Sequence, residues 1–214
     1  MAKIIGTITT SHVPAIGGAI ARGLQNDPYW KPFFDGFPPV RDWLAKMKPD
    51  VVVMVYNDHG LNFFLDKMPT FAVGAAPEYH NADEGWGIPT LPSAARCYKL
   101  GQAIGRAIQS WDSDKRVVVV GTGGLSHQLD GERAGFINKD FDLQFMESLT
   151  SDPTWATKYS IADLVELAGT QGIELLMWLA TRGALTGQVK KVQANYHIPI
   201  SNTAAGLMVM ENHA

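Results

Sequence analysis

The chain has 214 residues, of which 46% are hydrophobic and 18% are charged, a composition that fits one globular domain and argues against disorder. Eighteen Lys and Arg against twenty-one Asp and Glu give a formal charge of -3, so we expect no nucleic acid partner. The single cysteine, Cys97, excludes both an internal disulfide and a multi-thiolate metal site.

The beginning of the chain has no long apolar segment of the kind found in secretory signals, and no run in the sequence reaches eighteen apolar residues. Met1 is followed almost at once by a strand-like pattern. We therefore expect a cytoplasmic protein with no membrane partner.

Three short apolar runs rich in β-branched residues predict buried strands. They cover Ile4 to Thr9, Val51 to Tyr56 and Val117 to Val120, and each is too short for a helix. A fourth apolar run, Ala204 to Met210, predicts one more strand near the end of the chain.

Segments with helical spacing lie between and after these runs. Val40 to Met47 follows two prolines, and Cys97 to Trp111 places Leu100, Ile104, Ala107, Ile108 and Trp111 on one stripe. A third helix is expected from Gln171 to Arg182, with Thr170 as its N-cap and Gly183 after its last turn. Strands alternating with helices predict an α/β fold with a mostly parallel central sheet flanked by helices.

A histidine follows each of the first three predicted strands: His12, His59 and His127. A lone histidine in such a position usually serves only as a capping or hydrogen-bonding residue. In α/β folds, however, ligands gather outside the carboxyl ends of parallel strands, so the shared position predicts that the three imidazoles meet at one edge of the sheet.

Glu174 is surrounded by apolar neighbours in the third predicted helix. A carboxylate buried there would cost several kcal/mol unless it were paired, protonated or bound to a metal. The alternative is an exposed side chain near the helix start, where a negative charge is also favourable. Because Gln171 is the only other polar residue nearby, we predict that Glu174 is buried.

His12, His59 and Glu174 together offer two imidazoles and one carboxylate, with no sulfur ligand. This set is typical of non-haem Fe(II) oxygenases, although zinc hydrolases use the same ligand types. The sequence has no His-Glu-x-x-His motif of the common zinc peptidases, which favours oxygen chemistry.

Several segments, in order from one end of the chain to the other, resemble the type II extradiol dioxygenases. The resemblance is equally strong to the catalytic β subunits of protocatechuate 4,5-dioxygenases and to the gallate dioxygenases. The segments are Ile8–Pro14, Val55–His59, Gly121–Leu129, Arg133–Lys139, Gly172–Trp178 and Tyr196–Pro199 with Ser201–Thr203.

The resemblance implies ring cleavage of a small catechol-type acid, protocatechuate or gallate, by Fe(II) and O2. It implies His12, His59 and Glu174 as iron ligands and His127 as the catalytic acid/base. Ser201 and Asn202 match a segment near the substrate carboxylate. The implied assembly is a homodimer or a hetero-oligomer with a small α subunit.

The chain departs from this family at one point, where Pro92 is joined directly to Ser93. Family members carry several dozen further residues there, including an additional active-site histidine. We expect a single catalytic domain over residues 1–214 from which this central segment is missing, because deletion of central strands would leave exposed edges. Further residues after Ala214 are also expected. A zinc-dependent hydrolase and a non-catalytic metal-binding relative stay open as alternatives.

Overall fold

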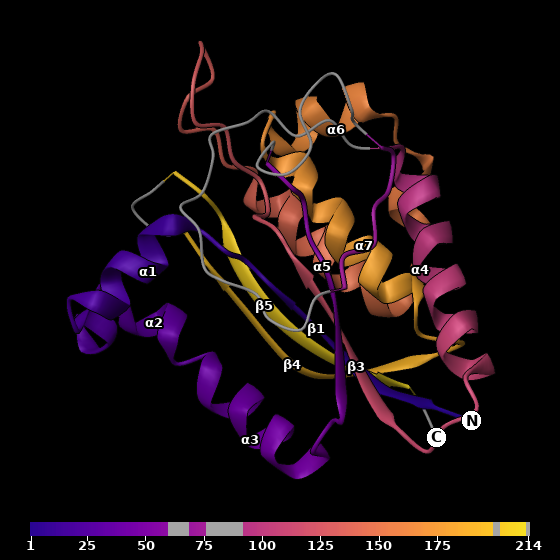
Figure 1. Cartoon of the computed structure of the whole chain (residues 1–214). Helices are drawn as coiled ribbons and strands as arrows, with labels where there is room; N and C mark the ends of the chain where they lie inside the picture. The colour runs from indigo at the N-terminus through magenta and orange to yellow at the C-terminus, as the bar shows by residue number, and fades with distance from the viewer. Residues whose placement is uncertain (60–68, 76–91, 199–201, 213–214) are drawn as a thin grey trace.

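A five-stranded sheet forms the centre of the molecule (Figure 1). The structure is a computed structural model, and it describes residues 1–59, 69–75, 92–198 and 202–212. The strand order is β2-β3-β1-β5-β4. Strands β2, β3 and β1 are parallel to one another, whereas β5 is antiparallel to both β1 and β4. The strands are β1 Lys3–Thr10, β2 Val51–Val55, β3 Arg116–Thr122, β4 Val189–His197 and β5 Ala205–Asn212.

Helices cover both faces of this sheet, with α1 to α3 on one side and α4 to α7 on the other (Figure 1). The α/β fold with a parallel core between helices is therefore confirmed. The helices are α1 Pro14–Ala21, α2 Lys31–Phe34, α3 Phe37–Met47, α4 Ala94–Ser110, α5 Lys139–Ser151, α6 Ile161–Ala168 and α7 Leu175–Gly183, and the 3-10 turns are Leu24–Asn26, Trp155–Lys158 and Gly172–Glu174. Within the described ranges, every helix falls short of what a bilayer crossing requires in length or apolar content.

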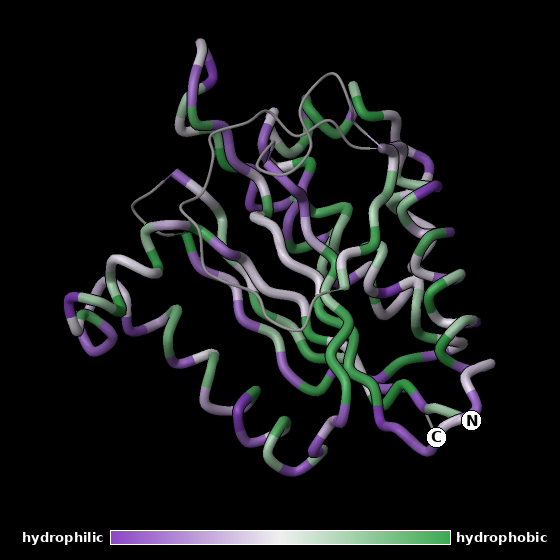
Figure 2. Tube along the Cα trace, viewed as in Figure 1, coloured by the Kyte–Doolittle hydropathy of each residue, from purple (hydrophilic) through white to green (hydrophobic). Residues whose placement is uncertain are grey.

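The core is divided by the sheet into two apolar layers. On the α3 side, Ile5 and Ile8 of β1 pack with Val40 and Trp43. On the other side, the strands pack against α4, α5 and α7 in a larger cluster that includes the completely buried Trp178. Figure 2 shows the hydrophobic residues gathered along the central strands. Burial of apolar surface on both faces explains why β1 and β3 read as continuous apolar runs.

Strand β2 differs from the other three predicted strands because it lies at the edge of the sheet. Val52 and Met54 are 55% and 57% exposed, and the other valines of β2 are half-buried. The prediction of a buried strand was therefore wrong for β2. An apolar run of five residues does not by itself tell an edge strand from a central one.

Helices α4 and α7 approach each other closely through glycines. A Cβ atom on Gly101 would lie 1.8 Å from the carbonyl oxygen of Ala180, and one on Gly105 would lie 2.6 Å from that of Ala184. Only glycine leaves room for this contact.

The predicted apolar stripe on α4 was wrong at two positions, because Ala107 and Trp111 are exposed.

The starts of all three predicted helices also differ from the predictions, and α4 begins at Ala94 rather than Cys97. Helix α3 begins at Phe37 rather than Val40, with proline in its first turn, where a missing N–H costs no hydrogen bond. The helix predicted from Gln171 starts as the 3-10 turn Gly172–Glu174 and continues as α7, so Thr170 is not its N-cap.

Candidate metal centre

The three candidate ligands come from three distant parts of the chain. His12 lies two residues after β1, and His59 lies four residues after β2. Because β1 and β2 run in the same direction, both histidines leave the sheet at the same edge. His59 has a φ of 55°, in the left-handed region, which turns the chain sharply at this point. Glu174 is the last residue of the 3-10 turn that leads into α7.

The side chains of these three residues converge on one point. Glu174 Oε2 lies 3.5 Å from His12 Nε2, and Glu174 Oε1 lies 3.1 Å from His59 Nε2. The two Nε2 atoms are 3.2 Å apart, and the imidazole rings meet edge to face. One ligand atom from each residue lies within 4.8 Å of the other two. This arrangement suits a single metal ion.

Glu174 is 3% exposed and its carboxylate accepts hydrogen bonds from two further groups. Asn57 Nδ2 donates to Oε1 over 3.3 Å, and the backbone N–H of Gly124 donates to Oε2 over 3.1 Å. Burial alone would raise the pKa of Glu174, but the hydrogen bond with His12 and the electrostatic interactions with His12 and His59 outweigh it and hold the pKa at about 2. Glu174 is therefore an anion at neutral pH.

The glycine-rich turn after β3 packs directly on Glu174. Gly123 has a φ of 146°, and a Cβ there would lie 2.8 Å from the carbonyl oxygen of Glu174. On the other side of the turn, Trp178 Nε1 donates to the carbonyl oxygen of Gly123 over 3.1 Å. Position 123 needs glycine for both reasons, its backbone conformation and the close approach of Glu174.

His127 lies on the same turn and is 6% exposed. Its Nδ1 lies 2.8 Å from the carbonyl oxygen of Leu125. A carbonyl can only accept, so we assign the proton to Nδ1, which leaves the lone pair of Nε2 available as a base. Burial lowers the pKa of His127 and keeps the ring neutral. A Cβ on Gly124 would lie 2.6 Å from His127 Cε1, and the Gly124 backbone N–H donates to Glu174, so the imidazole lies close to the Glu174 carboxylate.

The donor set fits a metal ion on chemical grounds. The two Nε2 atoms lie 3.2 Å apart, and the buried carboxylate beside them supplies negative charge, so two nitrogen ligands and one oxygen ligand face a common point. Three protein ligands, two nitrogen and one oxygen, leave further coordination positions open for other molecules.

Of the two remaining predicted site residues, Ser201 and Asn202, the structure describes only Asn202. Asn202 is exposed, has a φ of 54° and lies next to Gly135. Ser201 lies outside the described residues. The hydrogen bonds that Asn57 and Gly124 donate to Glu174 were not predicted from the sequence, although Asn57 stands in the same segment as His59 and this position is a signal for it.

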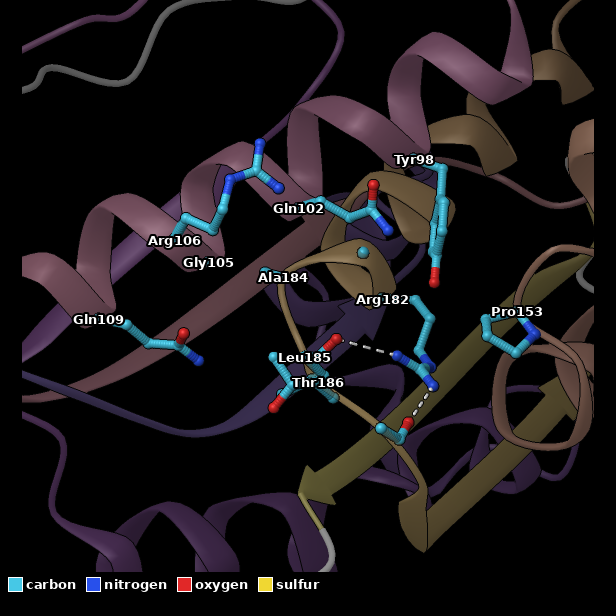
Figure 3. Close-up of a pocket in the computed structure, with 12 residues that line it drawn as sticks. Tyr98, Gln102, Gly105, Arg106, Gln109, Pro153, Arg182, Ala184, Leu185 and Thr186 are labelled. Atoms are coloured by element: carbon cyan, nitrogen blue, oxygen red, sulfur yellow. Dashed lines mark hydrogen bonds between the residues drawn. The ribbon is translucent and has the colours of Figure 1, made fainter.

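A separate hollow of about 370 Å³ lies at the opposite end of α7, beside α4 (Figure 3). The Arg182 guanidinium in its wall donates to the carbonyl oxygens of Leu149, Leu185 and Gly187 over 2.6 to 3.2 Å. These bonds use the guanidinium to join the last turn of α5 to the loop after α7. We therefore assign this hollow no part in the metal centre.

A protein family described as the catalytic LigB subunit of aromatic ring-opening dioxygenase matches residues 6–89 and 87–208 of the chain. The chain belongs to this family. The family match agrees with the resemblance to type II extradiol dioxygenases that six segments of the sequence carry.

Two curated relatives and one solved structure are similar to the chain. Gallate dioxygenase of Pseudomonas putida is 43% identical over 187 residues, which cover 82% of this chain and 55% of that protein. A 2,3-dihydroxyphenylpropionate/2,3-dihydroxicinnamic acid 1,2-dioxygenase of Rhodococcus jostii is 23% identical, covering 94% of this chain and 96% of that one. An uncharacterized protein of Escherichia coli K12 aligns with a TM-score of 0.44 at 13% identity, over 98% of this chain and 100% of that one. The chain thus spans about half the length of the gallate dioxygenase.

Proposed function

We propose that the chain is the catalytic part of an extradiol dioxygenase that uses non-haem Fe(II) and O2 to open the ring of protocatechuate or gallate. The observation that carries the proposal is the convergence of His12, His59 and Glu174 within 4.8 Å in a member of the ring-opening dioxygenase family. We further propose that the protein acts in the cytoplasm and assembles as a homodimer or with a small α subunit.

In this proposal, His12, His59 and Glu174 hold the iron. Fe(II) held there would have coordination positions left for a catechol and O2, and it would supply the redox chemistry that their reaction needs. The buried Glu174 carboxylate, held as an anion by its hydrogen bonds, offsets part of the metal charge.

His127 is proposed as the acid/base. Its Nε2 takes the proton from one hydroxyl of the substrate, while the Nδ1–H bond to Leu125 holds the ring in the required tautomer. The same nitrogen, once protonated, returns the proton later in the reaction. Ser201 and Asn202 are proposed to contact the substrate carboxylate, because they match the segment that lies near this carboxylate in the type II extradiol dioxygenases.

The test is oxygen uptake after anaerobic loading with Fe(II), with protocatechuate and gallate as alternative substrates and the Zn(II)-loaded chain as the control. We expect one equivalent of O2 consumed per ring opened, with iron and not with zinc. Hydrolytic activity with zinc would favour the zinc hydrolase instead. Iron binding with no oxygen uptake on either acid would favour a non-catalytic relative and defeat the proposal.

A variant separates metal binding from proton transfer. His127→Ala should keep its iron while turnover falls on the order of a hundredfold or more, the usual scale for losing a positioned proton-transfer group. Near-normal turnover per bound iron would contradict the assignment of His127. A parallel loss of iron would instead identify His127 as a ligand.

A further inference from the structure

Asp142 is a completely buried carboxylate in the first turns of α5, away from the three metal ligands. No lysine or arginine among the described residues forms an ion pair with it. A buried carboxylate without a cation is costly unless hydrogen bonds satisfy its oxygens. The partners of Asp142 therefore indicate why the fold retains it.

Three hydrogen bonds converge on the Asp142 carboxylate. Ser126 donates twice, from its backbone N–H to Oδ1 over 2.8 Å and from its hydroxyl to Oδ2 over 2.6 Å. The Tyr196 hydroxyl donates to Oδ2 over 2.9 Å. The Ser126 hydroxyl oxygen in turn accepts from the backbone N–H of Asn138 at the start of α5. Asp142 thus joins α5 to the glycine-rich turn and to β4.

Both segments that Asp142 holds lead to proposed reaction groups. Ser126 immediately precedes His127 in the chain. The backbone N–H of His127 donates to the carbonyl oxygen of Ala168, and His127 forms an isolated β-bridge with Thr203. Tyr196 lies at the end of β4, five residues before Ser201. One carboxylate therefore connects the segment of the proposed acid/base to the segment proposed to contact the substrate.

The ionised form of Asp142 is unfavourable for the folded chain. Burial raises the pKa of Asp142 to about 6, against the lowering effect of its hydrogen bonds with Ser126 and Tyr196. A neutral side chain would cost less at this position at neutral pH. Asp142 lowers the stability of the folded chain and is hydrogen-bonded to Ser126, the residue before His127. Its position therefore indicates a role in the reaction rather than in folding.

We propose that Asp142 is a positioning residue that fixes the imidazole of His127 through Ser126. The proposal rests on the proposed function of His127 as acid/base. The ionised carboxylate accepts both Ser126 bonds at once, which an amide cannot do because its nitrogen only donates. Since displacement by about 1 Å can cost on the order of a hundredfold in rate, loss of these bonds should reach turnover without removing any metal ligand.

The test compares Asp142→Asn with Asp140→Asn, a matched control that removes the same charge from the same helix turn at an exposed position. Each change is made alone and together with His127→Ala. Iron content, KM and kcat are measured on the Fe(II)-loaded chain with protocatechuate and with gallate. The chemical shift of the His127 Nδ1–H proton is measured on the Zn(II)-loaded chain, and the signal is assigned by its loss in His127→Ala.

We expect Asp142→Asn to keep its iron, to lower kcat on the order of 10- to 100-fold, and to move the His127 Nδ1–H signal. Because Asp142 acts through His127, the same change should lower kcat less than about twofold when His127 is already alanine. Asp140→Asn should alter neither quantity. Tyr196→Phe, which removes one of the three bonds, should give a smaller loss of kcat than Asp142→Asn.

Two results would overturn the proposal. The first is a His127 Nδ1–H signal that does not move in Asp142→Asn. This result overturns the proposal whether or not the chain converts substrate, so it is independent of the proposed function. An equal loss of kcat with and without His127 also does so, because it assigns Asp142 a purely structural role. A wild-type chain without oxygen uptake, but with a moved signal in the variant, contradicts the proposed function and leaves the positioning of His127 supported.

Discussion

The contact between α4 and α7 gives a prediction whose size follows from the structure. In Gly101→Ala, the new Cβ would lie 1.8 Å from the Ala180 carbonyl oxygen and 2.9 Å from the Gly183 Cα. Both neighbours are backbone atoms, so the two helices must move apart. Overpacking of this kind costs roughly 1 to 3 kcal/mol, which exceeds the gain of about 1 kcal/mol from replacing glycine by alanine within a helix.

Gly17→Ala is the matched control, because Gly17 lies in α1 and a Cβ there has no heavy atom within 4 Å. The same substitution should raise stability by about 0.5 to 1 kcal/mol at this open position. Urea unfolding measures both changes, and each kcal/mol corresponds to roughly 2 to 4 °C in Tm for a chain of this size.

The displacement should also reach the metal centre, because α7 continues directly from Glu174. We expect Gly101→Ala to unfold at lower urea and to bind iron more weakly, whereas Gly17→Ala does neither. The reasoning is refuted if the two variants are stabilised equally, since the close approach of the helices would then have no energetic consequence.

Three further substitutions test the anionic ligand, the buried Asp142 and the Arg182 hydrogen bonds. Glu174→Gln, which removes the anionic ligand, should lower the affinity for iron on the order of a hundredfold and so reduce the iron bound per chain. Metal analysis that shows full iron occupancy would contradict this. Burial raises the pKa of Asp142 from 3.8 to about 6, so the folded chain holds a proton between these pH values and its stability is lost as the pH rises through 6. In urea unfolding between pH 4 and pH 7, Asp142→Asn should therefore gain up to about 3 kcal/mol of stability relative to the wild type. A stability difference that stays constant over this pH range would exclude the raised pKa. Arg182→Met leaves three carbonyl oxygens without their donor and should cost roughly 3 kcal/mol, an expectation that fails if its urea midpoint matches the wild type.

Local pattern alone determined much of the fold. Apolar runs too short for helices located β1, β2, β3 and β5 to within a few residues of their observed ends, because burial on a sheet leaves a direct trace in composition. Strand β4 is not among the predicted strands. It carries Lys190 and Lys191 at the edge of the sheet, where exposed charges replace the apolar signal.

The candidate ligands could also be named from the sequence, since His12 and His59 follow strands and Glu174 stands in an apolar segment. Several features could not be predicted from the sequence. The exposure of β2 depends on strand order, which no single run records. The glycine contact at Gly101 depends on how closely α7 approaches, and an apolar stripe predicts a face without predicting its partner.

Tertiary structure alone decided what surrounds the candidate ligands. The hydrogen bonds of Asn57 and Gly124 to Glu174, and those of Ser126 and Tyr196 to Asp142, join residues from 16 to 117 positions apart. Each side chain is ordinary in its own segment, and its role arises only where the sheet and helices bring the segments together. Residue type and spacing therefore determined which atoms could bind a metal, whereas packing determined their charge, tautomer and support, because these depend on burial and on partners that local sequence does not contain.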